Sequence, residues 1–195
     1  MRRALSNRSL LLPLAAFVLA GCDALTGTDD DALLRVGRCA GPATSAPEAV
    51  VAPLRADGGA SSAELATGEW LARQVPGYAG SFYENDRFIL LLTHPERARE
   101  MKAALTATGY RSYDEALVRR ARWDAAQIYD WQLYVAHVVG WERGVVSFSY
   151  DLPGNRLLYG MEDEGSRQRF AERLVDAGIP CDLILLTVEG RPVLF

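Results

Sequence analysis

Lysine and histidine are almost absent from this chain, and cysteine is rare. Its 195 residues include a single lysine, Lys102, two histidines and three cysteines. So few cysteines and histidines exclude a rich metal framework, and we predict no bound metal and no cofactor. The formal net charge of −4 argues against nucleic-acid binding, which needs a basic face for phosphates. The 49% of hydrophobic residues is enough to build a folded core.

Long hydrophobic runs are also lacking. The longest, residues 9–20, follows three arginines and is too short to cross a bilayer as a helix, but it suits a signal peptide. It ends in Leu19-Ala20-Gly21-Cys22, which resembles the bacterial lipobox. We therefore expect residues 1–21 to be a lipoprotein signal peptide. Cys22 would carry the lipid (palmitate among its acyl chains) that anchors the protein to a cell-envelope membrane, facing the periplasm or the exterior. The alternatives are an ordinary signal peptide or a short membrane anchor.

The other two cysteines are Cys39 and Cys181. Outside the cytoplasm such a pair favours a disulfide, and the alternative is two separate thiols. Residues 22–60 are rich in Ala, Gly, Pro, Asp and Ser, and their prolines argue against a long helix or a central strand. The sequence therefore predicts a flexible tether over this segment.

One order of elements occurs twice in the rest of the chain: helix, strand, strand, helix, strand. The first module covers residues 61–123 and the second covers 124–190, while 191–195 form a tail. With an offset of 69 residues, Arg87 aligns with Arg156. The predicted fold class is α+β, with a small, mainly antiparallel sheet packed on helices in each module. The expected helices are near 62–75, 95–109, 124–138 and 164–178, and the expected strands near 80–83, 87–92, 116–123, 145–150, 155–161 and 183–188.

Short motifs in both modules carry a family resemblance. They are Tyr78-Ala79-Gly80-Ser81-Phe82 and Leu92-Thr93-His94-Pro95 in the first module, and Val146-Ser147-Phe148 and Asn155-Arg156-Leu157 in the second. Over about residues 64–188 the chain resembles the pro-regions of alpha-lytic and streptogrisin-type secreted serine proteases. It departs from their pattern at His94, where Asp is usual, and no protease domain follows the modules. The resemblance implies tandem α/β modules that bind an extracytoplasmic protease in trans.

Two features are candidate partner-binding elements. Arg119, Arg120 and Arg122 lie in a predicted edge strand. They suit an acidic partner, or else they prevent sheet-to-sheet aggregation. An exposed sheet edge could also add to a partner's sheet through main-chain hydrogen bonds. Phe195 ends an extended tail that either occupies a peptide groove or is a frayed terminus.

The sequence contains few residues that could catalyse a reaction. His94 and His137 are the only imidazole bases, and we expect a surface or capping role for the first and a partly buried structural role for the second. Nucleophile-elbow, phosphate-loop and paired metal-ligand motifs are absent. Glu162-Asp163-Glu164 is best explained as a helix start. The sequence thus favours a membrane-anchored lipoprotein that binds a protein or peptide without chemistry of its own. A structural envelope lipoprotein and an envelope hydrolase with a histidine base are the alternatives.

Overall fold

The computed structural model describes residues 45–57, 63–141, 143–180 and 182–190. The predicted signal peptide, the predicted lipidation site Cys22, the predicted pair Cys39 and Cys181, and the tail residue Phe195 lie outside the described residues. None of the helices in the described part of the chain is long and apolar enough to span a membrane.

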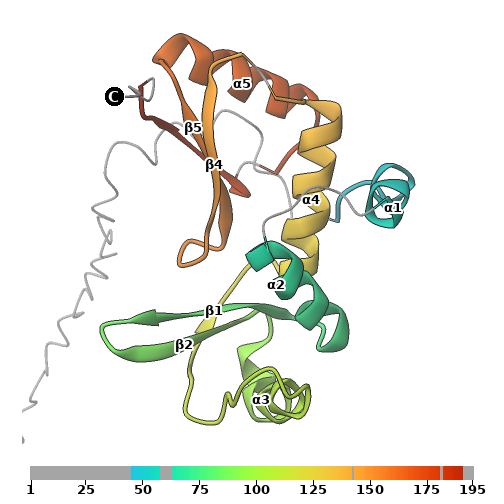
Figure 1. Cartoon of the computed structure of the whole chain (residues 1–195), viewed down its shortest axis with the longest axis vertical. Coiled ribbons are helices and arrows are strands. Elements are labelled where there is room, and N and C mark those ends of the chain that lie inside the picture. The colour runs from blue at the N-terminus through green and yellow to red at the C-terminus, as the bar shows by residue number, and fades with distance from the viewer. Residues whose placement is uncertain (1–44, 58–62, 142, 181, 191–195) are drawn as a thin grey trace, which may run out of the picture.

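The described chain forms two similar modules, drawn one above the other in Figure 1. The order of elements, helix–strand–strand–helix–strand, occurs twice and confirms the predicted α+β fold. An additional helix, α1, precedes the first module. The helices are α1 (Glu48–Ala56), α2 (Ala63–Gln74), the 3-10 turn η2 (Pro95–Arg97), α3 (Ala98–Ala107), α4 (Ala125–Val138) and α5 (Glu164–Asp176). The strands are β1 (Tyr78–Glu84), β2 (Arg87–Leu92), β3 (Leu117–Arg120), β4 (Val145–Asp151), β5 (Arg156–Met161) and β6 (Ile184–Val188).

Each module has a three-stranded sheet of the same topology. In the first, β2 lies between β1 and β3, and in the second, β5 lies between β4 and β6. The hairpin partners are antiparallel, but β3 runs parallel to β2 and β6 runs parallel to β5. The sheets are therefore mixed rather than mainly antiparallel. The reason is that a helix connects the last two strands of each module, and such a crossover returns the chain in the same direction.

Three hydrophobic clusters pack against these sheets in the described chain, and the two larger ones form the cores of the modules. In the first module, Leu90 and Leu92 of β2 pack with Met101 and Leu105 of α3, and all four are buried. The second and larger core joins the second sheet to α4, α5 and α1. Helix α4 packs on this core through Ile128, Trp131 and Val135, which are buried, whereas Val138 at its end is exposed. Tyr134 on the same helix donates its hydroxyl to the carbonyl of Ala177 at 3.3 Å.

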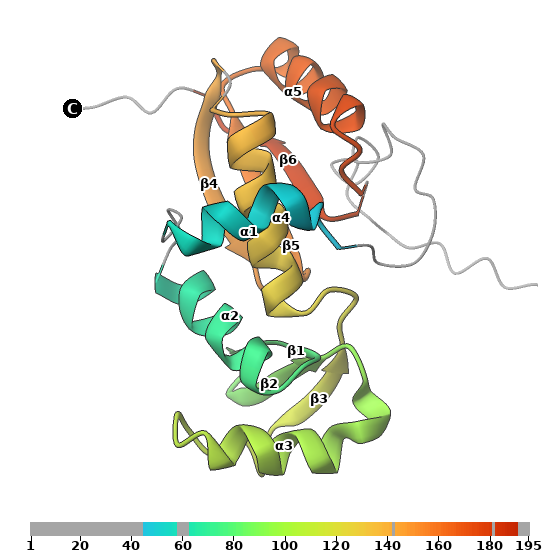
Figure 2. The same ribbon diagram turned by 90° about the vertical axis from the view of Figure 1, so that its right-hand side faces the viewer.

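Helix α1 occupies part of the segment that the sequence predicts to be a tether. Val51 in this helix is fully buried against the second core. Although Pro53 lies within α1, burial of the apolar face offsets the backbone hydrogen bond that proline lacks. Figure 2 shows α1 lying across α4, on the side of the molecule where α2 also approaches α4. The tether prediction is therefore wrong for residues 48–56.

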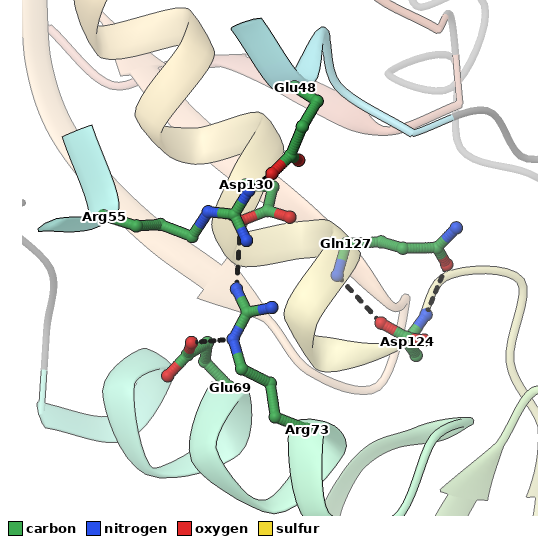
Figure 3. A network of polar contacts seen from close by, with 7 residues as sticks. All are labelled: Glu48, Arg55, Glu69, Arg73, Asp124, Gln127 and Asp130. Atoms are coloured by element: carbon green, nitrogen blue, oxygen red, sulfur yellow. Dashed lines mark hydrogen bonds and ion pairs between the residues drawn. The ribbon is translucent and has the colours of Figure 1, made fainter. Parts of the chain in front are cut away.

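A polar network fixes these three helices to one another (Figure 3). Asp130 of α4 lies 3.4 Å from Nε of Arg55 in α1 and 3.2 Å from a guanidinium nitrogen of Arg73 in α2. Each arginine has a second carboxylate on its own helix, Glu48 for Arg55 and Glu69 for Arg73. Asp130 is thus shared by both modules and by α1.

The link between the modules is held by one buried asparagine. Asn155, in the turn between β4 and β5, accepts hydrogen bonds from the backbone N–H groups of Arg122 (3.0 Å) and Trp123 (2.8 Å). Its Nδ2 donates to the carbonyl of Trp123 (3.0 Å) and to the hydroxyl of Tyr150 (3.2 Å). One side chain of the second module therefore satisfies three backbone groups where the chain leaves the first. Figure 1 shows the β4–β5 hairpin directed toward β1.

Candidate functional site

The first candidate surface is the edge of the second sheet that β4 forms. Strand β4 pairs with β5 on one side and has no strand neighbour on its other side among the described residues. It is seven residues long, and its side chains are mostly half-buried, with Ser149 exposed. An unpaired edge of this length presents backbone donors and acceptors that a second chain can pair with.

An exposed tryptophan adjoins that strand. Trp141, in the loop between α4 and β4, is 70% exposed, and its ring meets that of Phe148 edge-on with 6.3 Å between centroids. The ring of Phe148 packs at a tilt against that of Tyr159, with 4.8 Å between centroids, and Tyr159 packs in the same way against the fully buried Phe170 at 5.2 Å. A series of aromatic contacts thus connects Trp141 to the hydrophobic core. We call β4 together with Trp141 the β4 surface. Trp141 is not among the residues predicted from the sequence to bind a partner; its position between Gly140 and Gly144 is the signal that could have indicated an exposed loop.

The three arginines predicted to bind a partner lie on or next to β3, an edge strand of the first sheet. Arg119 and Arg120 belong to the edge strand β3, and Arg122 follows it at the module junction. All three have a carboxylate partner in the same chain. The pairs are Arg119 with Glu84 at 2.5 Å, Arg120 with Glu96 at 3.5 Å, and Arg122 with Asp182. An acidic partner would have to displace the chain's own carboxylates from these arginines.

The two histidines lie in different modules. His94 precedes η2, is 57% exposed at its side chain, and places Nδ1 3.1 Å from the carboxylate of Glu96. His137 is in the last turn of α4 and is exposed, so the expectation of a partly buried histidine is wrong. The last turn of α4 packs on the core through Val135 and Val139, and His137 lies on the opposite, solvent-facing side of the helix. Among the described residues, no group of three His, Cys, Asp or Glu side chains is arranged to hold a metal ion.

The carboxylates at the start of α5 have a structural role. Asp163 is the N-cap and accepts a hydrogen bond from the backbone N–H of Ser166 at 2.7 Å, and this bond holds the pKa of Asp163 below its ordinary value. Glu164 contacts the guanidinium of Arg167 at 2.5 Å. The expected helix start is confirmed, and both carboxylates are held by groups of their own helix.

The second candidate site is a cavity of about 350 Å³ at the junction of the modules. Its walls come from α2, β1, the segment after α3, the start of α4 and the β4–β5 hairpin. The hairpin wall is fixed by Tyr150, whose hydroxyl donates to the carbonyl of Ala79 at 3.0 Å. No local sequence pattern indicates this cavity, because it forms between elements about 70 positions apart in the chain.

Comparison with known proteins adds no assignment to these surfaces. A scan of protein-family models finds no family that matches this chain. A search of curated proteins finds no significant relative. The resemblance to protease pro-regions therefore stays a prediction from short motifs.

Proposed function

We propose that the chain is an extracytoplasmic lipoprotein, anchored to a membrane through Cys22, whose folded part binds a protein or peptide without catalysing a reaction. Binding takes place at the β4 surface, where a strand of the partner extends the second sheet. Strand addition supplies affinity through main-chain hydrogen bonds, so it needs little specificity from side chains.

The observation that carries this proposal is the combination of a free edge strand with an aromatic anchor. Trp141 exposes most of its surface, and its ring packs against Phe148. Phe148 is in turn connected to the core through Tyr159 and Phe170. Tryptophans in such positions contribute strongly to protein interfaces, because they bury a large area with little loss of side-chain freedom. The arginines of β3 are a weaker candidate, since carboxylates of the chain already occupy them.

The partner class that we propose is an extracytoplasmic serine protease, which the module would help to fold or would inhibit in trans. The tandem modules and the motifs of the family resemblance support this choice. A hydrolase that uses a histidine base has less support, because His94 is engaged by the carboxylate of Glu96 on an exposed turn and His137 lies on the other module.

The test measures inhibition and refolding of an alpha-lytic-type protease by the full chain in lipid nanodiscs. Trp141→Ser should weaken the effect about 30-fold, the range of an interface anchor. Ser149→Lys should weaken it as well by placing a charge at the edge of β4. Tyr83→Ser is the matched control, because Tyr83 is 67% exposed and stacked on Phe88 in the first module. Equal loss in the control, or no interaction of the parent protein with the protease, would refute the proposal.

The anchor has a separate test. Mass measurement of the protein extracted from membranes should show cleavage before Cys22 and the added mass of acyl chains. An unmodified and uncleaved N-terminus would refute the anchor while leaving the proposed binding at β4 untouched.

A further inference from the structure

The cavity at the module junction has the size and position of a small-molecule site. Its volume of about 350 Å³ falls within the range of known ligand pockets, which favour the boundaries between domains. It lies beside β1, an edge strand of the first sheet, and across from the hairpin of the second module. The cavity shares Tyr150 with the β4 surface, but Trp141 and Ser149 are not among its lining residues. What it binds therefore does not depend on the proposed function.

The walls of the cavity are held in place by contacts that cross the junction. The Tyr150 hydroxyl bonds to the Ala79 carbonyl and also accepts a hydrogen bond from Asn155. On the facing strand, Gly80 has φ +131°, and a Cβ at this position would lie 2.3 Å from a methyl carbon of Leu152. A side chain at this position would therefore displace the end of Leu152, and the two walls meet at this point. The cavity is therefore preformed, which lowers the entropy cost of binding.

The lining of the cavity combines apolar side chains with the hydroxyl groups of Thr67 and Ser81, and it carries one charge. Leu65, Leu152, Ala125 and the ring of Tyr78 supply apolar surface. Arg111 is the only charged residue among the described residues of the lining. Its guanidinium lies over the ring of Phe88, 4.7 Å from the centroid, and in the described part of the chain no carboxylate forms an ion pair with it. Arg111 is exposed, and because no carboxylate of the described chain neutralises it, its guanidinium is available to an anion from solution.

From this lining we infer that the cavity binds a small monocarboxylate with an apolar or aromatic body. The planar guanidinium of Arg111 matches a carboxylate in a two-pronged geometry, and the leucines and tyrosines take the body. The same chemistry occurs in free organic acids and in the C-terminal residue of a peptide. The two sources differ in their hydrogen-bonding groups. The C-terminal residue of a peptide also has an amide, which the backbone of β1 can bind, and a free acid lacks it.

Calorimetric titration of the full chain in lipid nanodiscs, with empty nanodiscs as the blank, tests this inference. N-acetyl-L-phenylalanine is the probe, and we expect saturable binding at about 1 mM or tighter. Its neutral amide should bind at least about ten-fold more weakly, since it lacks the charge that Arg111 recognises. If 3-phenylpropionate binds as well as the probe, the ligand is a free acid; preference for the probe identifies a peptide end.

Variants locate the site. Arg111→Gln should weaken binding of the probe at least about ten-fold. Arg99→Gln is the matched control, because Arg99 is also exposed, lies on α3 outside this cavity, and should leave binding unchanged. Ser81→Phe fills the cavity and should abolish binding. No saturation up to about 10 mM, equal binding of the amide, or an unchanged affinity in Arg111→Gln would overturn the inference. None of these measurements involves β4 or a protease, so their failure is distinguishable from that of the proposed function.

Discussion

Replacing Asn155 with alanine should uncouple the two modules. The side chain is 7% exposed and makes four hydrogen bonds, three of them to backbone groups of Arg122 and Trp123. Alanine leaves two N–H groups and one carbonyl without these partners. Asn155 also has φ +54°, in the left-handed region, where alanine is strained. The variant therefore combines lost hydrogen bonds with backbone strain, and the two effects need to be separated.

Asp86 provides the matched control. It aligns with Asn155 at the offset of 69 residues, has φ +61°, and is exposed in the turn between β1 and β2. Asp86→Ala should cost about 1 kcal/mol from backbone strain alone. Asn155→Ala adds the loss of four bonds, each with a net contribution of about 1 kcal/mol, so it should cost about 3–4 kcal/mol more than the control. In a domain of this size, that difference corresponds to about 10 °C in Tm.

Urea unfolding followed by tryptophan fluorescence measures both costs. Trp123 is 1% exposed and lies at the bonds that are lost, so its emission reports on the junction. If the modules uncouple, the single transition of the parent protein should divide into two. A cost for Asn155→Ala no larger than that for Asp86→Ala would refute the role of Asn155 in holding the modules together.

Two further predictions concern the same junction. Gly80→Ala should destabilise the protein by about 2–3 kcal/mol in urea unfolding, since its Cβ meets Leu152 at an unfavourable φ. Gly109→Ala, with φ +75° and open space around it, should cost only about 1 kcal/mol, and an equal cost for both would contradict the clash. Burial raises the pKa of Asp130 despite the nearby guanidinium groups of Arg55 and Arg73. The native state therefore binds more protons than the unfolded chain in the acidic range, and the contribution of this carboxyl falls as pH rises. The free energy of unfolding of the parent minus that of Asp130→Asn should thus decrease from about pH 3 to about pH 6, and an increase would contradict the burial argument.

The order of elements was predictable because each element carries its own signal. Asp124, for example, caps α4 through the backbone N–H of Gln127 at 2.8 Å, and the sequence shows an acidic residue before an apolar period. Helix α1 was not predictable from local pattern. It has Pro53 in its interior and no side-chain cap, and it is stabilised by contacts with α4 that lie far along the chain. The same limit applies to the cavity and to the β4 surface, which depend on how separate elements pack.

The contacts that join the modules arise where the two repeats differ. The first hairpin connects β1 to β2 through residues 85–86, whereas the second connects β4 to β5 through residues 152–155. The longer turn supplies Leu152, which packs on the first sheet with Ile89 and Leu91, and it positions Asn155 against the chain at Trp123. The first hairpin has the shorter turn, and in the corresponding position it presents the exposed Asp86 to solvent. The insertion thus gives the second hairpin the contacts that hold the modules together and form one wall of the cavity, while the shared order of elements builds the two sheets.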